Sequence, residues 1–303
     1  MGLLVDGTWQ DQWYDTKTSG GKFKRQESQF RNWIKADGST GFTPDIGRYR
    51  LYVSLACPWA HRTLIFRKLK GLENAIDVVI VQALMGDKGW ILPNGDPLHT
   101  IYTSVDPHIT TRVTVPILWD KQTDQIVSNE SAEIIRMLNS EFGEHGTDYY
   151  PEHLRPQIDE INTLIYNNIN NGVYKTGFAT TQEAYEEAYT NLFNALDRVE
   201  EILSENRYLV GDQITEADWR LFTTLVRFDA VYVGHFKCNK KRIIDYPNIW
   251  SYLRELYQVE GVAETLDMDH IKTHYYGSHK TINPTGIIPV GPEIDFMSPH
   301  GRG

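Results

Sequence analysis

Cys57 is the residue best placed for covalent chemistry. It lies in "YRLYVSLACPWAHRTLIFRKLKG", residues 49–71, where an alternating strand-like segment meets a helical one. Pro58 then occupies the first helical position, so the sulfur is expected to face the unpaired N–H groups at the positive end of the helix dipole. This position favours the thiolate, and His61 and Arg62 add positive charge nearby. The pattern predicts a nucleophilic thiol; the alternative is a buried, inert core cysteine.

Ala60 stands three residues after Cys57, where a dithiol site would carry its second cysteine. In a C-x-x-C site that second thiol resolves a mixed disulfide from within the protein. The chain has only two cysteines, and the other, Cys238, is remote in sequence. We therefore expect an external thiol to resolve any mixed disulfide at Cys57, and we expect a reducing compartment.

Two further patterns point to the nature of that thiol. In "VTVPILWDK", Val115 precedes Pro116, which forces an extended residue before it, permits a cis peptide bond and leaves the Val115 backbone available for pairing with a peptide-like ligand. In "SNESAEIIRML", Glu130 and Ser131 begin a predicted helix. An acid and a hydroxyl there can bind an ammonium and a carboxylate together, as a γ-glutamyl group carries them.

Arg112 and Trp90 are candidates for holding the other end of such a ligand. Taken singly, Glu130 is also a favourable charge in a first helical turn, and Ser131 is an ordinary helix start. Taken together, these residues predict a glutathione site.

The elements that must position these residues divide the chain. Between residues 49 and 142 the pattern alternates between strands and helices, which indicates an α/β layer structure. The expected strands are 49–54, 76–82, 113–119 and 125–128, the expected helices are 58–70 and 130–142, and a Gly-rich loop is expected at 86–111. Beyond the loop near residue 150 the pattern is helical, at 152–170, 181–206, 215–233 and 247–258. Thr215 and Asp218 predict a capping box at the start of the third of these helices.

This organisation predicts four parts. Residues 1–46 are polar and Gly-rich and are expected to pack over the core without forming a domain. An α/β domain at 47–143 precedes an all-helical domain at 151–282. The last part, 283–303, is rich in proline and is expected to run as an extended tail.

The composition is that of a soluble globular protein, with 41% hydrophobic and 23% charged residues. A net charge of −10 disfavours binding to nucleic acid or to anionic membranes. The short basic run at 237–242 is interpreted as a solvated loop. Neither a targeting signal nor an apolar run long enough to span a bilayer is apparent in the sequence, so a cytoplasmic protein is expected.

Several of these stretches together resemble the glutathione transferase superfamily. More narrowly, "SLACPWAHRTLI", "VTVPILWDK", "IVSNESAEIIRML" and "NNGVYKTGFA" resemble the glutathionyl-hydroquinone reductases, or Xi class, over essentially the full chain. The resemblance implies a thioredoxin-like domain, a helical domain and a homodimer. No metal cofactor is expected, because His270 and His274 lack a third ligand at a convincing spacing. The resemblance also implies glutathione-dependent reduction of S-glutathionyl hydroquinones, with Cys57 as nucleophile. By position it implies glutathione binding by Trp90, Arg112, Val115, Glu130 and Ser131.

The resemblance further implies a hydroquinone pocket lined by Tyr174, Tyr232 and Tyr275, with Tyr174 and Tyr275 taking part in catalysis. Whether Tyr275 or Tyr276 faces the site is left open by the sequence. Phenol hydroxyls both donate and accept hydrogen bonds, which suits binding of a substrate with phenols of its own. Among 17 tyrosines, however, any single one is more often a packing residue.

Three other functions remain as alternatives. A general thiol transferase or dehydroascorbate reductase would use the same cysteine without an aryl pocket. A non-catalytic protein of the same fold would carry Cys57 incidentally. A metal enzyme is suggested only by His270 and His274, which are spaced i, i+4 without a third ligand at a convincing spacing.

Overall fold

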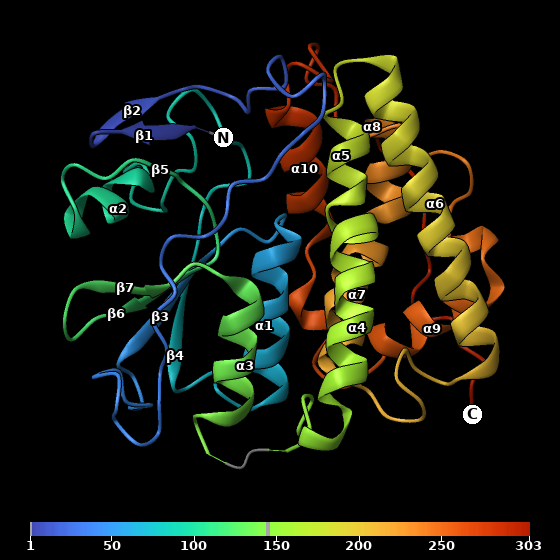
Figure 1. Cartoon of the computed structure of the whole chain (residues 1–303), viewed down its shortest axis with the longest axis horizontal. Coiled ribbons are helices and arrows are strands. Elements are labelled where there is room, and N and C mark those ends of the chain that lie inside the picture. The colour runs from blue at the N-terminus through green and yellow to red at the C-terminus, as the bar shows by residue number, and fades with distance from the viewer. Residues whose placement is uncertain (1, 144–145) are drawn as a thin grey trace. The chain divides into compact units, whose positions relative to one another are not determined.

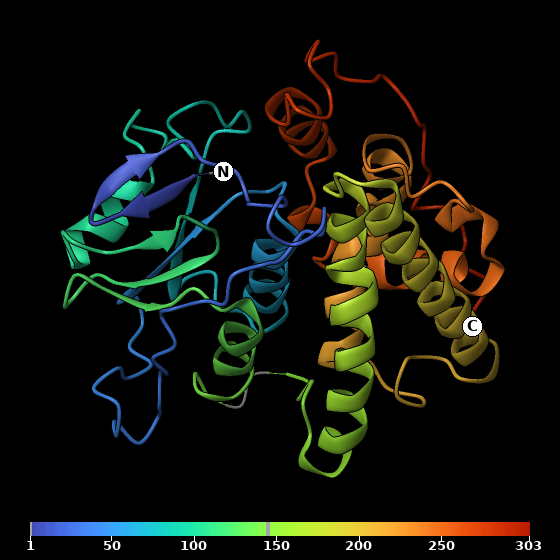
Figure 2. The same cartoon turned by 45° about the horizontal axis from the view of Figure 1, so that its top comes forward.

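The computed structural model describes residues 2–143 and 146–303. The contacts within it divide the chain into two compact units, whose elements are labelled in Figure 1 and seen from a second direction in Figure 2. Unit 1 comprises Met1–Trp13, Gln26–Thr147 and Thr265–Ser278; unit 2 comprises Tyr14–Arg25, Asp148–Glu264 and His279–Gly303. Within the described residues, none of the helices has the length and apolar character needed to cross a membrane.

Unit 1 contains a four-stranded sheet in the order β4-β3-β6-β7, in which β3 and β4 are parallel and the other neighbours antiparallel. The strands are β3 (Tyr49–Val53), β4 (Ile76–Ile80), β6 (Ile117–Asp120) and β7 (Gln125–Ser128). Helices α1 (Pro58–Leu69) and α3 (Ser131–Ser140) lie side by side in Figures 1 and 2. A thioredoxin-like domain is thus confirmed.

Two expectations in this unit were wrong. The strand predicted at 113–119 begins only at Ile117, because Pro116 has no N–H to donate to the sheet. The predicted loop at 86–111 contains α2 (His99–Val105) and reaches β5 (Thr111–Arg112). Because α2 is rich in β-branched residues, its sequence does not favour a helix, and tertiary contact through the buried Tyr102 stabilises it.

The N-terminal residues contain two strands that the sequence analysis did not predict. β1 (Leu3–Val5) and β2 (Thr8–Gln10) form a hairpin, and β1 pairs with β5 to give a second sheet in the order β2-β1-β5. Asp6 and Gly7 form the turn with φ values of 48° and 71°. Asp-Gly is a favoured pair for such a hairpin turn. A Cβ on Gly7 would also lie 1.7 Å from the Pro107 carbonyl oxygen, so only glycine fits there.

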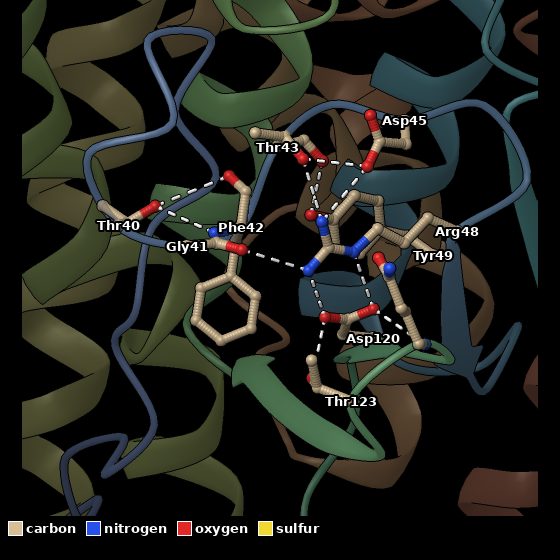
Figure 3. Close-up of polar contacts among 10 residues, drawn as sticks. Thr40, Gly41, Phe42, Thr43, Asp45, Arg48, Tyr49, Asp120 and Thr123 are labelled. Carbon is tan, nitrogen blue, oxygen red and sulfur yellow. Dashed lines mark hydrogen bonds and ion pairs between the residues drawn. The ribbon is translucent and has the colours of Figure 1, made fainter.

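An ion pair secures the beginning of β3 (Figure 3). The Arg48 guanidinium donates to both carboxylate oxygens of the buried Asp120 on β6, at 2.9 Å from Nε and 2.6 Å from Nη2. The same guanidinium donates to Thr43 Oγ1 at 2.9 Å. This two-point contact ties the preceding loop to β3 and β6, and β3 leads directly to Cys57.

Unit 2 is helical, as predicted. Its main elements are α4 (Arg155–Ile165), α5 (Gly172–Gly177), α6 (Gln182–Glu205), α7 (Glu216–Arg227), α8 (Val233–His235) and α9 (Pro247–Tyr257). Short π-helical segments, η2 (Tyr166–Asn170) and η3 (Phe228–Tyr232), continue α4 and α7. The capping box of α7 is confirmed: the Thr215 N–H donates to Asp218 Oδ2 at 2.7 Å, and burial raises the pKa of Asp218.

The C-terminal residues 279–303, all of which the structure describes, contain no helix or strand. Phe296 packs against Tyr257 with ring centroids 4.9 Å apart, and Arg302 Nε pairs with Glu255 Oε2 at 2.6 Å. Helix α10 (Met268–Ser278) precedes this tail, and it was not among the predicted helices. The contacts group α10 with unit 1 and residues 14–25 with unit 2, so they divide the chain differently from the predicted ranges.

Candidate active site

Cys57 lies at the junction of β3 and α1, as the sequence predicts. It is the N-cap residue of α1, with an extended backbone (φ −75°, ψ 119°), and Pro58 follows as the first helical residue. Its carbonyl accepts the first helical hydrogen bond, from the His61 N–H at 2.9 Å. The thiol is free of any disulfide and partly exposed. The N-terminal end of a helix stabilises negative charge nearby.

Val115 lies beside this thiol. The Cys57 thiol donates to the Val115 carbonyl oxygen at 3.4 Å, and the Val115–Pro116 peptide bond is cis. The adjoining Thr114 carbonyl accepts a hydrogen bond from the buried Tyr102 hydroxyl at 2.9 Å, which fixes the backbone there. The structure therefore brings the predicted nucleophile and the predicted ligand-pairing backbone together.

Glu130 and Ser131 mark the start of α3, as predicted. Glu130 is the N-cap, and its Oε1 accepts from the Ala132 N–H at 3.0 Å while Oε2 accepts from Ser28 Oγ at 3.1 Å. Ser131 is buried, and its Oγ accepts from Arg62 Nη1 at 3.4 Å. Arg62, which the sequence suggested as a charge near Cys57, thus links α1 to the beginning of α3.

Trp90 is 3% exposed and carries an unsatisfied donor. Within the described part of the chain, its Nε1 has no hydrogen-bond partner. Its indole stacks on the His274 imidazole with ring centroids 4.5 Å apart and an interplanar angle of 19°. A buried N–H without an acceptor is unfavourable unless another molecule supplies the acceptor.

Arg112 has a partner that the sequence did not suggest. Its guanidinium donates to the backbone carbonyls of Gln12 and Trp13, the latter at 3.0 Å. Arg112 also lies opposite Leu3 in the pairing of β1 with β5. The carbonyls of Gln12 and Trp13 therefore hold the guanidinium of Arg112, a candidate glutathione-binding group, in position.

Helix α10 and Thr265, which precedes it, contact the rest of unit 1 through three histidines. His61 Nε2 lies 2.7 Å from Thr265 Oγ1, His270 Nε2 lies 3.4 Å from Ser54 Oγ, and His274 Nδ1 lies 3.0 Å from the Ala83 carbonyl oxygen. The sequence analysis did not predict these contacts, because it considered the i, i+4 pair of His270 and His274 only as a possible metal site. In the structure the two histidines of that pair bind polar atoms of unit 1.

Tyr275 follows His274 on α10 and is 2% exposed, whereas Tyr276 is partly exposed. Tyr275 thus belongs to the same unit as Cys57 and Trp90. Because α10 also holds Trp90 through His274, the position of this tyrosine is coupled to that of the indole.

Tyr174 and Tyr232 are brought together in unit 2. Their ring centroids are 6.2 Å apart, and both side chains are buried. Sequence reasoning missed two residues of the N-terminal segment that pack on Tyr174. Phe23 stacks with it at 6.4 Å, and the Arg25 guanidinium lies 5.0 Å from its ring centroid.

The second cysteine is also in unit 2. Cys238 is fully buried and free of any disulfide, and its Sγ lies 3.8 Å from the Phe236 carbonyl oxygen. Burial raises the pKa of this thiol well above its usual range. Cys238 therefore has the character of a packing residue.

Family models match both domains of the chain. Residues 56–141 match the family described as the glutathione S-transferase N-terminal domain, and residues 182–255 match the corresponding C-terminal domain. The chain is 57% identical to glutathionyl-hydroquinone reductase YqjG of Escherichia coli, over 100% of this chain and 98% of the relative. It is 56% identical to glutathionyl-hydroquinone reductase PcpF of Sphingobium chlorophenolicum, over 96% of each.

Two solved structures give the same result. The glutathione-bound structure of YqjG from Escherichia coli superimposes with a TM-score of 0.91 at 53% identity, covering 99% of each chain. The Xi-class glutathione transferase of Natrialba magadii superimposes with a TM-score of 0.93 at 48% identity, covering 100% of this chain and 96% of the other. With its thioredoxin-like and helical domains and its monothiol helix start, the chain belongs to the glutathione transferase superfamily, in the group formed by the Xi-class glutathione transferases and glutathionyl-hydroquinone reductases.

Proposed function

We propose that this protein removes glutathione from S-glutathionyl hydroquinones, using a second glutathione as reductant. The observation that carries the proposal is the partly exposed Cys57 thiol at the N-terminus of α1, with Ala60 in place of a second cysteine. Support comes from two full-length relatives that are named glutathionyl-hydroquinone reductases.

The proposed glutathione binding involves five residues of unit 1 besides Cys57. The Trp90 Nε1 donor has no acceptor among the described residues, and a ligand carboxylate would provide one. Glu130 and Ser131 supply an acid and a hydroxyl at the start of α3 for the γ-glutamyl group. The Val115 backbone pairs with the peptide part of the ligand, and Arg112 contributes positive charge.

The first chemical step breaks the bond between the ring carbon and the sulfur. In the keto tautomer of the substrate, the sulfur-bearing carbon already carries a proton. The Cys57 thiolate attacks the sulfur and forms a disulfide with the glutathionyl group, while the electron pair of the C–S bond leaves with the ring as an enolate. Protonation of that enolate oxygen gives the hydroquinone. Without the tautomer, the leaving group would be an aryl carbanion, which is far less stable.

The second step regenerates the thiolate. A second glutathione, as its thiolate, attacks the glutathionyl sulfur of the mixed disulfide and releases glutathione disulfide. The net reaction converts one glutathionyl hydroquinone and one glutathione into one hydroquinone and one glutathione disulfide. Both electrons that reduce the ring come from the two glutathione sulfurs.

Tyr174, Tyr232 and Tyr275 are proposed to bind the phenols of the substrate. A tyrosine hydroxyl that donates to the developing enolate oxygen stabilises the leaving group at the moment when charge appears on it. The same hydroxyl can accept from a substrate phenol and so favour the keto form. On this proposal Tyr174 and Tyr275 are the catalytic pair and Tyr232 completes the binding surface.

A homodimer and a cytoplasmic location complete the proposal, and both rest on the family resemblance. Light scattering coupled to size exclusion tests the first, and localisation of the tagged full-length chain tests the second. A monomeric mass at micromolar concentration would remove the dimer from the proposal.

The test of the activity is to incubate the purified protein with a glutathionyl hydroquinone and glutathione. Chromatography should show hydroquinone and glutathione disulfide released in equal amounts. Mass spectrometry of protein given the substrate alone should show one glutathione attached to Cys57. Reduction of a simple glutathione mixed disulfide without hydroquinone release would instead make the protein a general thiol transferase.

A further inference from the structure

One buried hydroxyl, that of Tyr102, contacts both of the chain segments to which glutathione binding was assigned above. Tyr102 lies on α2, in the stretch for which the sequence predicted a loop, and its side chain is fully buried. Burial raises the pKa of Tyr102, so the phenol keeps its proton and can donate as well as accept. Its partners lie in two segments that are separated along the chain.

The first segment is the one that leads into Pro116. The Tyr102 hydroxyl donates to the Thr114 carbonyl oxygen at 2.9 Å and accepts from the Thr114 N–H at 3.3 Å, and Thr114 Oγ1 lies 3.4 Å away. One oxygen atom therefore holds both backbone groups of Thr114. The next residue is Val115, whose carbonyl accepts from the Cys57 thiol and whose backbone is the proposed partner of the ligand's peptide group.

The second segment leads into α3. The Asn129 side-chain amide donates to the Tyr102 hydroxyl at 3.3 Å. On its other side, Asn129 Oδ1 accepts from the Phe30 N–H at 3.2 Å, so turning the amide round would break both bonds. Asn129 is followed directly by Glu130 and Ser131, the acid and the hydroxyl assigned to the γ-glutamyl group.

These contacts match the capacity of a phenol oxygen, which donates once and accepts twice. It donates to the Thr114 carbonyl, and it accepts from the Thr114 N–H and from the Asn129 amide. Removing the oxygen would leave buried polar groups on both segments without this partner, which is unfavourable. The hydroxyl therefore joins the two segments to each other as well as to α2.

We propose that Tyr102 is a positioning residue of the glutathione site, which keeps the Val115 backbone and the start of α3 at the separation that one glutathione molecule spans. This inference rests on the glutathione binding proposed above. A ligand held at two points loses affinity when those points shift by about 0.5 Å relative to each other. The proposal also gives a role to α2, whose sequence does not favour a helix and whose buried residue is Tyr102.

The test compares two buried tyrosines of unit 1. Tyr102→Phe deletes the hydroxyl that joins the two segments. Tyr49→Phe is the matched control, because Tyr49 is also fully buried and its hydroxyl donates to a backbone carbonyl outside both segments, that of Thr43 at 2.6 Å. Both variants should melt below the wild type, since each loses a buried, hydrogen-bonded hydroxyl.

Isothermal titration with S-methylglutathione, a thioether that forms no disulfide with Cys57, measures binding without turnover. Tyr102→Phe should weaken this binding about three- to tenfold, and Tyr49→Phe should change it less than about twofold. In turnover with a glutathionyl hydroquinone, Tyr102→Phe should raise the KM for glutathione by a similar factor and leave kcat within about twofold of the wild type. Unchanged affinity in Tyr102→Phe, equal weakening in both variants, or a fall in kcat without a rise in KM would overturn the proposal.

A second variant tests the same link from the other side if Tyr102→Phe does not fold. Asn129→Leu removes the amide that joins the hydroxyl to α3 and should weaken binding of S-methylglutathione by a similar factor. In the Asn129→Leu background, Tyr102→Phe should weaken binding by a smaller factor than it does in the wild type, because the link is already broken. Equal factors in the two backgrounds would contradict the proposal.

The same experiments separate this inference from the proposed activity. If the wild type shows no saturable binding of S-methylglutathione, the glutathione site and the role of Tyr102 are both rejected. If binding follows the expected pattern but no hydroquinone is released, the proposed activity is rejected and the role of Tyr102 is supported.

Discussion

The two cysteines show that the same side chain has different chemical properties in two different environments. Cys57 ends an extended segment at a helix N-terminus, is partly exposed and donates to a backbone carbonyl. Cys238 lies in a short loop of unit 2 and is fully buried, and burial raises the pKa of its thiol. An exposed helix terminus stabilises the thiolate, whereas an apolar interior stabilises the thiol.

The contrast extends to the surroundings of each cysteine. In unit 1, to which Cys57 belongs, the buried indole N–H of Trp90 has no acceptor among the described residues. Near Cys238, unit 2 packs Phe236 against Phe178 and Tyr232, with ring centroids 4.9 and 5.5 Å apart. The first unit contains a buried donor that no described residue satisfies, and the surroundings of Cys238 are a packed aromatic core.

The largest effect is expected from Cys57→Ser. An alcohol is neither ionised near neutral pH nor a sulfur nucleophile, so hydroquinone release should fall by more than roughly 10³-fold. Steady-state turnover with a glutathionyl hydroquinone measures it. Cys57→Ala should retain the fold by circular dichroism, and wild-type turnover in either variant would sink the assignment of Cys57 as nucleophile.

Tyr→Phe substitutions should give the next largest effect. Loss of one transition-state hydrogen bond at residue 174, 232 or 275 should slow hydroquinone release about tenfold to a hundredfold. Reduction of a simple glutathione mixed disulfide should hardly change, because its leaving thiolate needs no ring protonation.

Tyr276→Phe is the matched control for the substitution at Tyr275, since the two residues are adjacent on α10. If Tyr276→Phe slowed hydroquinone release and Tyr275→Phe did not, then Tyr276 and not Tyr275 would act on the substrate. If turnover of the glutathionyl hydroquinone and of the mixed disulfide fell equally, the tyrosines would support the fold. If neither rate fell, the tyrosines would be packing residues.

A smaller effect should appear in the stability of the region around Cys238. Burial lowers the pKa of nearby His235 to about 4, with a smaller contribution from Lys237, and its Nε2 lies 3.0 Å from His279 Nδ1. The unfolded chain therefore binds more protons than the folded protein between about pH 6.5 and 4. Stability from neutral His235 is fully present above about pH 6.5 and is lost as the pH falls toward 4.

Urea denaturation at pH 7, 6 and 5 measures this loss. The free energy of unfolding should fall by up to about 1.4 kcal/mol per pH unit from His235, and by about 2–3 kcal/mol over the whole window. His235→Gln should flatten that slope in proportion. Identical slopes in wild type and variant would show that His235 titrates alike in both states.

The smallest effect on activity is expected from Cys238→Ala. Because this thiol belongs to the packed core, hydroquinone turnover should stay within about twofold of the wild type. A thiol reagent should modify Cys57 in the native protein and Cys238 only after unfolding. The prediction would be contradicted if the reagent labelled Cys238 rapidly in the native protein. It would also be contradicted if a Cys57–Cys238 disulfide formed after substrate treatment.

Where most of the candidate residues lie in the fold could be predicted because their signals are local. A cysteine before a proline, a Val-Pro pair and an acid-serine helix start each mark a backbone junction, and short-range physics decides where such junctions fall. The structure accordingly has Cys57 at the N-cap of α1, beside the Val115 carbonyl, and Glu130 at the N-cap of α3.

What could not be predicted depends on contacts between distant parts of the chain. Nothing near Arg112 indicates that its guanidinium binds the carbonyls of Gln12 and Trp13. Stacking of His274 on Trp90 likewise joins two segments far apart in sequence. The Asp6-Gly7 turn, by contrast, was a readable hairpin signal, and it was overlooked because the strands that it joins have only three residues each.

The interleaving of the two units has a consequence for biosynthesis. Unit 1 receives its last helix only from residues 265–278, after nearly all of unit 2 has been made. A ribosome synthesises the chain from its first residue onward. The contact between Trp90 and His274 therefore cannot form until the chain between them, which is more than half of the protein, has been translated. The nascent thiol domain therefore emerges incomplete, and no contiguous stretch of the gene encodes either unit alone.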